Sequence, residues 1–161
     1  MHPQWFKKVL VATAIGSLCF SSAAMAEKTL KMAYALSKDS HYGAGAKAFE
    51  ESIGKSTNGE IKIEQFANSA LGGEREVIEG LQIGTVDAAI LSTGATLNFV
   101  PQTGVFDIPF LFRDLDHARK VLDGDIGNKL LAEFPKRGLV AVAWGEQGFR
   151  HLTNSKHAVK T

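Results

Sequence analysis

The stretch LGGEREVIEGLQIGTVDAAILSTGATLNFVPQTGVFDIPFLF, residues 71–112, carries the most informative pattern in this 161-residue chain. After a glycine pair, residues 74–83 place Val77, Ile78 and Leu81 on one apolar stripe at helical spacing, and a glycine follows at position 84. Residues 86–91 then form a nearly continuous apolar run, which is typical of a strand buried on both faces of a parallel sheet. The stretch therefore predicts a helix followed by a buried strand.

The segments before this stretch alternate in the same way. Residues 29–35 and 61–66 are predicted strands, because each is a short apolar-leaning run. Between them, apolar side chains recur every three or four residues over positions 42–53, which predicts a helix with one buried face. The Asn-Gly pair at 58–59 is expected to end that helix in a left-handed cap.

After the stretch, residues 115–122 and 126–134 are predicted helices, and residues 139–144 are a predicted strand. The order β-α-β-α-β-α-β indicates an α/β fold with a mostly parallel, helix-covered sheet and right-handed crossovers. In such sheets, ligands bind beyond the carboxyl ends of the strands. The loops that could bind a ligand are residues 37–42, 67–74, 92–96 and 145–150.

The first 26 residues predict a cleaved signal peptide. Lys7 and Lys8 form a positive start, residues 9–20 form an apolar core, and residues 24–26 match a small-x-small cleavage site. The apolar core is shorter than the ~20 residues that a membrane span requires, so we expect export without stable membrane insertion. The roughly 135 residues that follow are enough for one compact domain.

Cysteine content and charge exclude several classes of protein. The only cysteine, Cys19, lies in the expected signal peptide, so the mature chain would have no disulfide and no cysteine nucleophile. Without Lys7 and Lys8, 16 basic residues face 17 acidic residues, and no basic stripe appears, so we expect no nucleic-acid partner. The five histidines lack metal-ligand spacing, so we expect no metal site.

The nearest enzyme signature is the run GAGAKA at residues 43–48, whose spacing fits a glycine-rich dinucleotide fingerprint. Six residues separate Leu36 from Gly43, so the tight turn that a pyrophosphate needs is absent, and close packing of a helix on a sheet explains the run better. Ser92 lies outside any G-x-S-x-G motif, and nothing places a histidine near it. We therefore expect neither a cofactor nor catalysis.

Four segments together resemble the solute-binding proteins of tripartite ATP-independent periplasmic (TRAP) transporters. They are the opening strand with its polar bend, NSALGGEREVIEGLQIGTVD (residues 68–87), GVFDIPFLFRD (residues 104–114) and WGEQGFRHLTNSK (residues 144–156). The resemblance implies a two-lobed periplasmic protein that closes around a small organic acid, such as a dicarboxylate or a sugar acid. It also implies delivery of that acid to a membrane permease.

The same resemblance implies which residues bind the ligand. Arg150 matches an arginine that lines the cleft of the family, and a guanidinium fork can bind a carboxylate through two hydrogen bonds. Ser92 and Thr93 match the ligand-facing end of the third strand, although hydroxyls at strand ends also cap backbone groups. The further candidates, in the loops after the first two strands, are His41, Asn68 and Glu74. Glu74 would also complement the dipole of its helix.

Members of this family continue into a second lobe, and residue 161 lies near the point where the chain would enter it. The sequence is therefore interpreted as a signal peptide, residues 1–26, and a first ligand-binding lobe, residues 27–161, truncated before the second lobe. We expect one lobe to bind a carboxylate weakly or not at all, because closure excludes water and strengthens charged contacts. Two alternatives stay open: an exported α/β enzyme acting on a small carboxylate, and an inactive remnant.

Overall fold

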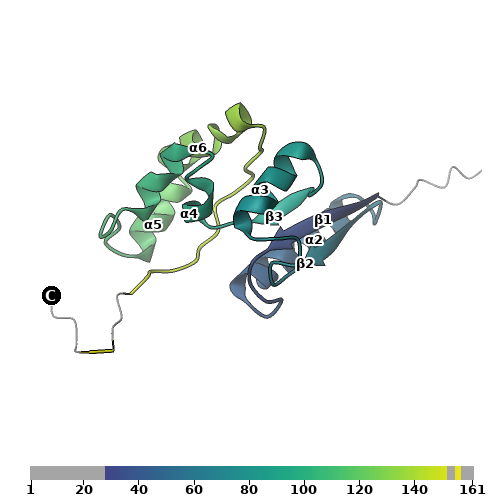
Figure 1. Cartoon of the computed structure of the whole chain (residues 1–161). Coiled ribbons are helices and arrows are strands. Elements are labelled where there is room, and N and C mark those ends of the chain that lie inside the picture. Colours follow the sequence, from purple (N-terminus) through teal and green to yellow (C-terminus); the bar gives the residue numbers. More distant parts are fainter. Residues whose placement is uncertain (1–27, 152–154, 157–161) are drawn as a thin grey trace, which may run out of the picture.

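The computed structural model describes residues 28–151 and 155–156, and it is built around a three-stranded parallel sheet of order β2-β1-β3 (Figure 1). The register pairs Lys28 of β1 with Ile61 of β2, and Met32 of β1 with Ala88 of β3. This architecture confirms the predicted α/β class. The elements, in chain order, are β1 (Lys28–Tyr34), α2 (His41–Ser56), β2 (Ile61–Phe66), α3 (Glu74–Ile83), β3 (Ala88–Ile90), α4 (Thr93–Thr96), η1 (Pro101–Asp107), α5 (Leu115–Leu122), α6 (Asp125–Leu131) and η2 (Phe134–Arg137).

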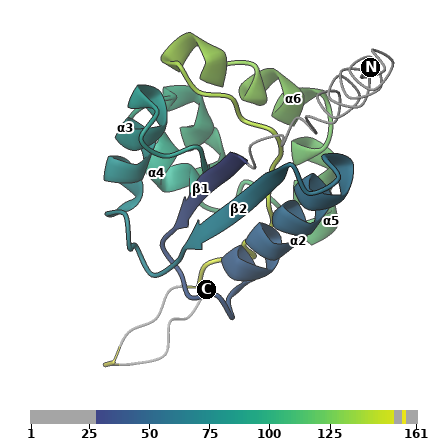
Figure 2. The same ribbon diagram turned by 90° about the vertical axis from the view of Figure 1, so that its right-hand side faces the viewer.

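The central strand β1 is buried on both faces, because successive side chains of a strand point to opposite sides. Met32 and Tyr34 pack with Tyr42 of α2 on one face. Ala33 packs with Val77 of α3 on the other face. Figure 2 shows α2 and α3 on opposite sides of the sheet. The two helices therefore form the outer layers of a three-layer core.

Local capping signals set the helix ends. The Ser40 side chain caps α2 by accepting a hydrogen bond from the amide of Gly43 at 3.3 Å. At the other end of α2, the amide of Gly59, whose φ is 81°, donates to the carbonyl of Gly54 at 2.8 Å, which confirms the predicted left-handed stop. Gly84 ends α3 with a φ of 77°, again as predicted.

The run at residues 43–48 packs α2 closely against its surroundings. A Cβ atom built on Gly43 would lie 1.9 Å from the carbonyl oxygen of Lys38, so no other residue fits without moving the backbone. A Cβ atom on Gly45 would lie 3.4 Å from Cδ1 of Ile90 in β3. These contacts support helix packing as the reason for the small residues.

The prediction of a strand over residues 139–144 is wrong. This segment has no pairing with the sheet in the described part of the chain. Its side chains still alternate between buried and exposed, since Leu139 is buried, whereas Val140 is 80% and Val142 is 78% exposed. Leu139 and Trp144 pack instead on a cluster around Ile78 of α3. A period of two predicts extended backbone, but a strand also needs a neighbour that the pattern cannot supply.

Smaller differences affect other elements. The third strand covers only Ala88–Ile90, and the helix predicted over residues 126–134 divides into α6 and the 3-10 helix η2. The aromatic-proline run begins within η1, which was not predicted because 3-10 helices follow no long hydrophobic period. No helix within the described residues is long and apolar enough to cross a membrane. The predicted signal peptide lies outside those residues.

Candidate functional site

The loops that follow β1 and β2 are joined by backbone hydrogen bonds at the carboxyl edge of the sheet. The amide of Asn68 donates to the carbonyl of Leu36 at 2.9 Å, and the amide of Ser69 donates to the carbonyl of Tyr34 at 3.2 Å. Asn68 and Ser69 both adopt a φ of 55°, and the Asn68 side chain is exposed. The first two candidate loops therefore form one continuous rim, in which Asn68 reaches solvent.

Glu74 and Ser92 join the next two loops. The Ser92 amide donates to Oε1 of Glu74 at 2.7 Å, and the Ser92 hydroxyl donates to Oε2 at 2.7 Å. The same hydroxyl accepts from the amide of Ala95 at 3.3 Å and caps α4. Both carboxylate oxygens of Glu74 are thus engaged in holding the start of α4 against the start of α3. The structure brings these two candidates into direct contact.

Thr93 connects the loop after β3 to the end of η1. Its hydroxyl donates to Oδ1 of Asp107 at 2.8 Å. Asp107 was not among the predicted site residues, although it stands inside the aromatic-proline run, where an isolated carboxylate is the one polar signal. The hydroxyls of Ser92 and Thr93 therefore have their protons committed to carboxylates, and only their lone pairs can meet a ligand.

His41 and Tyr42 begin α2 with their rings in edge contact, at a centroid distance of 4.8 Å and an interplanar angle of 79°. His41 is exposed, whereas the Tyr42 side chain is buried. Burial raises the pKa of the Tyr42 phenol, the Glu74 carboxylate raises it further, and the Arg150 guanidinium opposes the rise. The charges of Glu74 and Arg150 thus have opposite effects on the pKa of the Tyr42 phenol.

Arg150 lies near the end of residues 139–151, a segment without helix or strand. Its side chain is exposed, and it follows Gly148, which adopts a φ of 83°. Residues 147–151 make no hydrogen bond or ion pair with the rest of the described chain. The guanidinium is thus available to an anion.

The candidate site residues supply the exposed guanidinium of Arg150, the hydroxyl lone pairs of Ser92 and Thr93, and the starts of α2 and α3. Among the residues that the structure describes, no group of three histidine, cysteine, aspartate or glutamate side chains could hold a metal ion. A guanidinium can bind a carboxylate, and hydroxyl lone pairs can accept from hydroxyl groups, so these groups are suited to a small acid that carries both. The apolar spacing of Tyr42 predicts a core position on its helix, and its burial in the core beside Met32 and Tyr34 confirms this.

One protein family and several known proteins are similar to this chain. The family model for "Bacterial extracellular solute-binding protein, family 7" matches residues 32–161. A solute-binding protein of Verminephrobacter eiseniae is 46% identical over 139 residues, which are 86% of this chain and 42% of that relative.

Two solved structures are similar as well. The first, a TRAP periplasmic solute binding protein from Bordetella bronchispeptica with density assigned to pantoate, is 73% identical with a TM-score of 0.80, over 83% of this chain and 44% of that one. The second, from Polaromonas sp. JS666 and bound to D-erythronate, is 54% identical with a TM-score of 0.78, over 81% and 43%. This chain therefore spans less than half the length of these three relatives.

Proposed function

Because this chain belongs to the bacterial extracellular solute-binding proteins of family 7, which include components of TRAP transporters, we propose that it captures a small organic acid in the periplasm. It binds its ligand without transforming it, and delivers it to the membrane permease subunits of a TRAP system. Residues 1–26 direct its export, and residues 27–161 form the first ligand-binding lobe.

The observation that carries this proposal is the exposed, unpaired side chain of Arg150. Its guanidinium makes no ion pair with the described residues, and its charge opposes the rise that Glu74 causes in the pKa of the Tyr42 phenol. A guanidinium binds a carboxylate through two parallel hydrogen bonds, and the pair gains strength where water is excluded. Arg150 is therefore the carboxylate-binding residue of this lobe.

The hydroxyls of the site favour a hydroxy acid over a dicarboxylate. Ser92 and Thr93 donate their protons to Glu74 and Asp107, so they can only accept hydrogen bonds from a ligand. A hydroxyl group of the ligand can donate to them, whereas a second carboxylate cannot. Pantoate and D-erythronate, the acids in the two similar structures, share a 2,4-dihydroxybutanoate skeleton. The preferred ligand is accordingly a monocarboxylate with a four-carbon main chain and hydroxyls at positions 2 and 4.

A thermal-shift titration tests the proposal, because a ligand that binds only the folded state stabilises it by mass action. Millimolar pantoate or D-erythronate should raise the melting temperature, and succinate should do so less. The increase should vanish in Arg150→Ala and persist in Arg137→Ala, which removes another exposed arginine. A cooperative melt that neither hydroxy acid shifts would contradict ligand capture, whereas an equal shift with succinate would contradict only the selection for hydroxyls.

A further inference from the structure

The segment that carries Arg150 is held to the body of the protein at few points. We name residues 139–150 the strap. Trp144 fixes its middle, because the indole NH donates to the carbonyl of Gly127 at 3.1 Å and the ring meets Phe106 edge-on at 5.0 Å. Beyond Trp144, the last anchor before Arg150 is Glu146, whose Oε2 accepts from Nε of Arg119 at 2.6 Å.

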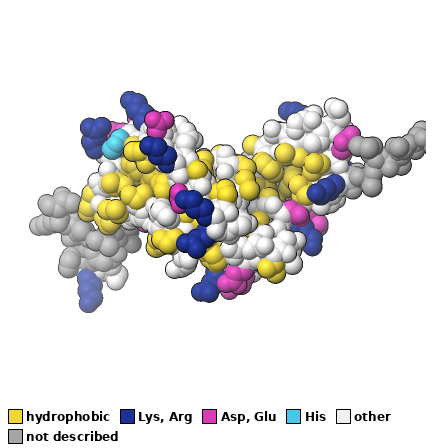
Figure 3. Space-filling view, turned by 90° about the horizontal axis from the view of Figure 1, so that it is seen from above, with side chains coloured by type: hydrophobic (Ala, Val, Ile, Leu, Met, Phe, Trp, Pro, Cys, Tyr) yellow, Lys and Arg dark blue, Asp and Glu magenta, His cyan; other side chains and the backbone are white. Residues whose placement is uncertain are grey.

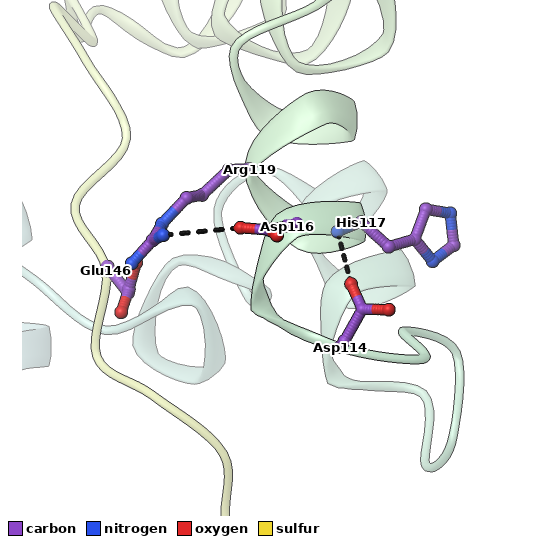
Figure 4. Close-up of polar contacts among 5 residues, drawn as sticks. All are labelled: Asp114, Asp116, His117, Arg119 and Glu146. Atoms are coloured by element: carbon purple, nitrogen blue, oxygen red, sulfur yellow. Dashed lines mark hydrogen bonds and ion pairs between the residues drawn. The ribbon is translucent and has the colours of Figure 1, made fainter.

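Arg119 is itself held in place on α5. Its Nη1 lies 3.5 Å from Oδ1 of Asp116 one turn earlier, so one guanidinium bridges its own helix and the strap (Figure 4). The hydrogen bond with Glu146 is the main reason that the pKa of Arg119 is raised. The first turn of α5 is also fixed, because Asp114 accepts from the amide of His117 at 2.7 Å. The strap is thus attached to the last turn of α5, a helix whose first turn is capped.

Stability alone is a poor explanation for this ion pair. The Arg119 and Glu146 side chains are 54% and 43% exposed, and exposed ion pairs typically contribute little to folding. The position of Glu146 matters more. Arg150 lies four positions after Glu146, a reach of at most about 14 Å, and six positions after Trp144, a reach of at most about 22 Å.

We propose that Arg119 and Glu146 are positioning residues, which hold the strap and so restrict where the Arg150 guanidinium can lie. The proposal rests on the function proposed above. Effective concentration falls with roughly the −3/2 power of tether length. Loss of the Glu146 anchor lengthens the tether of Arg150 back to Trp144, so the effective concentration of the guanidinium should fall about twofold. Greater freedom of the strap adds to this loss, and we expect acid binding to weaken about two- to fourfold.

Glu146→Gln is the decisive variant, because the loss of its negative charge and the release of the strap should have opposite effects on acid binding. Removing a negative charge near Arg150 would by itself strengthen the binding of an anion, whereas releasing the strap weakens it. Glu133→Gln is the matched control, since it removes another exposed ion pair, with Lys136 at 2.7 Å, outside the strap. The double variant Arg119→Gln/Glu146→Gln should bind no more weakly than the weaker single variant, because both changes break one interaction.

Calorimetric titration of the full chain with pantoate and D-erythronate provides the binding arm of the test. Amide ¹⁵N heteronuclear NOEs provide the second arm: in Glu146→Gln they should fall for residues 147–150 and stay unchanged in α5 and β1. Equal or tighter binding by Glu146→Gln, or unchanged NOEs in the strap, would overturn the positioning role. If the unmodified chain bound neither acid, the proposed function would fail first, and the positioning role with it.

Discussion

Glu74 accepts two hydrogen bonds from a single residue, one from the amide and one from the hydroxyl of Ser92, both at 2.7 Å. Glutamine keeps one acceptor but presents an NH2 group to the other donor, so Glu74→Gln loses one charged hydrogen bond and weakens the second. We expect the free energy of unfolding, measured by urea denaturation, to fall by about 1–2 kcal/mol.

Glu76→Gln is the control for that variant. Glu76 lies in the same first turn of α3, so both substitutions remove the same favourable interaction with the helix dipole, worth about 0.3–1 kcal/mol. Only Glu74 bonds Ser92, and the difference between the two variants therefore measures that contact. Equal losses in the two variants would show that Glu74 acts through the dipole alone.

Tyr42 provides a prediction about alkaline pH. Burial raises the pKa of its phenol above the usual value of 10.0, so the folded state favours the neutral form. Its contribution to stability is therefore complete below about pH 10, and it is lost as the pH rises from there through the raised pKa. Tyr42→Phe should leave stability at neutral pH nearly unchanged and make the alkaline decline shallower, as measured by urea denaturation at several pH values.

Tyr34→Phe separates this effect from the loss of a hydrogen bond. The pKa of Tyr34 is also raised, chiefly by burial, but its hydroxyl donates to Oε1 of Gln65 at 2.7 Å. Tyr34→Phe should therefore lose about 1 kcal/mol already at neutral pH. An alkaline decline in Tyr42→Phe as steep as in the unmodified chain would show that other groups, such as lysines, determine it.

At the residue scale, the sequence identified which loops meet but not how their side chains pair. Ser92 and Glu74 were both predicted at the carboxyl ends of strands, and a common sheet edge brings them together. Both carboxylate oxygens of Glu74 accept hydrogen bonds from Ser92 because the starts of α3 and α4 lie close together. No local sequence pattern encodes that distance. For the same reason the sequence offered no sign of the pair formed by Arg119 and Glu146, 27 residues apart.

At the scale of elements, local signals predicted helices and paired strands well. α5 has the predicted bounds, since Asp114 caps it, and β2 matches its predicted span. The failure over residues 139–144 has a definite cause: Leu139 and Ala141 alternate with Val140 and Val142 as in a half-buried strand, but their inner side chains rest on helices and loops. Periodicity reports which face is buried, and pairing depends on residues far away in the chain.

Hydrogen exchange tests this difference. The amides of residues 140–143 have no backbone hydrogen-bond partner within the described chain, so they should exchange rapidly. Met32 and Ala33, in contrast, lie in a strand paired on both sides and should be among the most protected amides. Protection of residues 140–143 equal to that of β1 would show that this segment joins the sheet in solution.

At the scale of the whole molecule, a small core leaves much apolar surface in contact with water. Val140 and Val142 are 80% and 78% exposed, Ile83 is 76% exposed, and Phe110 is 99% exposed with a φ of 61°. Figure 3 shows hydrophobic side chains spread across one face of the protein. Large exposed apolar areas promote association in soluble proteins, so this chain should self-associate as its concentration rises.

The two exposed valines allow this to be tested without disturbing the core. Val140→Thr/Val142→Thr keeps the branched shape and the preference for extended backbone, and it places hydroxyls where both side chains already meet water. Sedimentation equilibrium should give a lower average mass for the double variant, and binding of a hydrophobic dye should decrease, with an unchanged melting temperature. Leu139→Thr is the contrasting variant. It places a hydroxyl in the cluster around Ile78, so its main effect should be a lower melting temperature. An average mass that stayed the same in the double variant would show that residues 140 and 142 take no part in association.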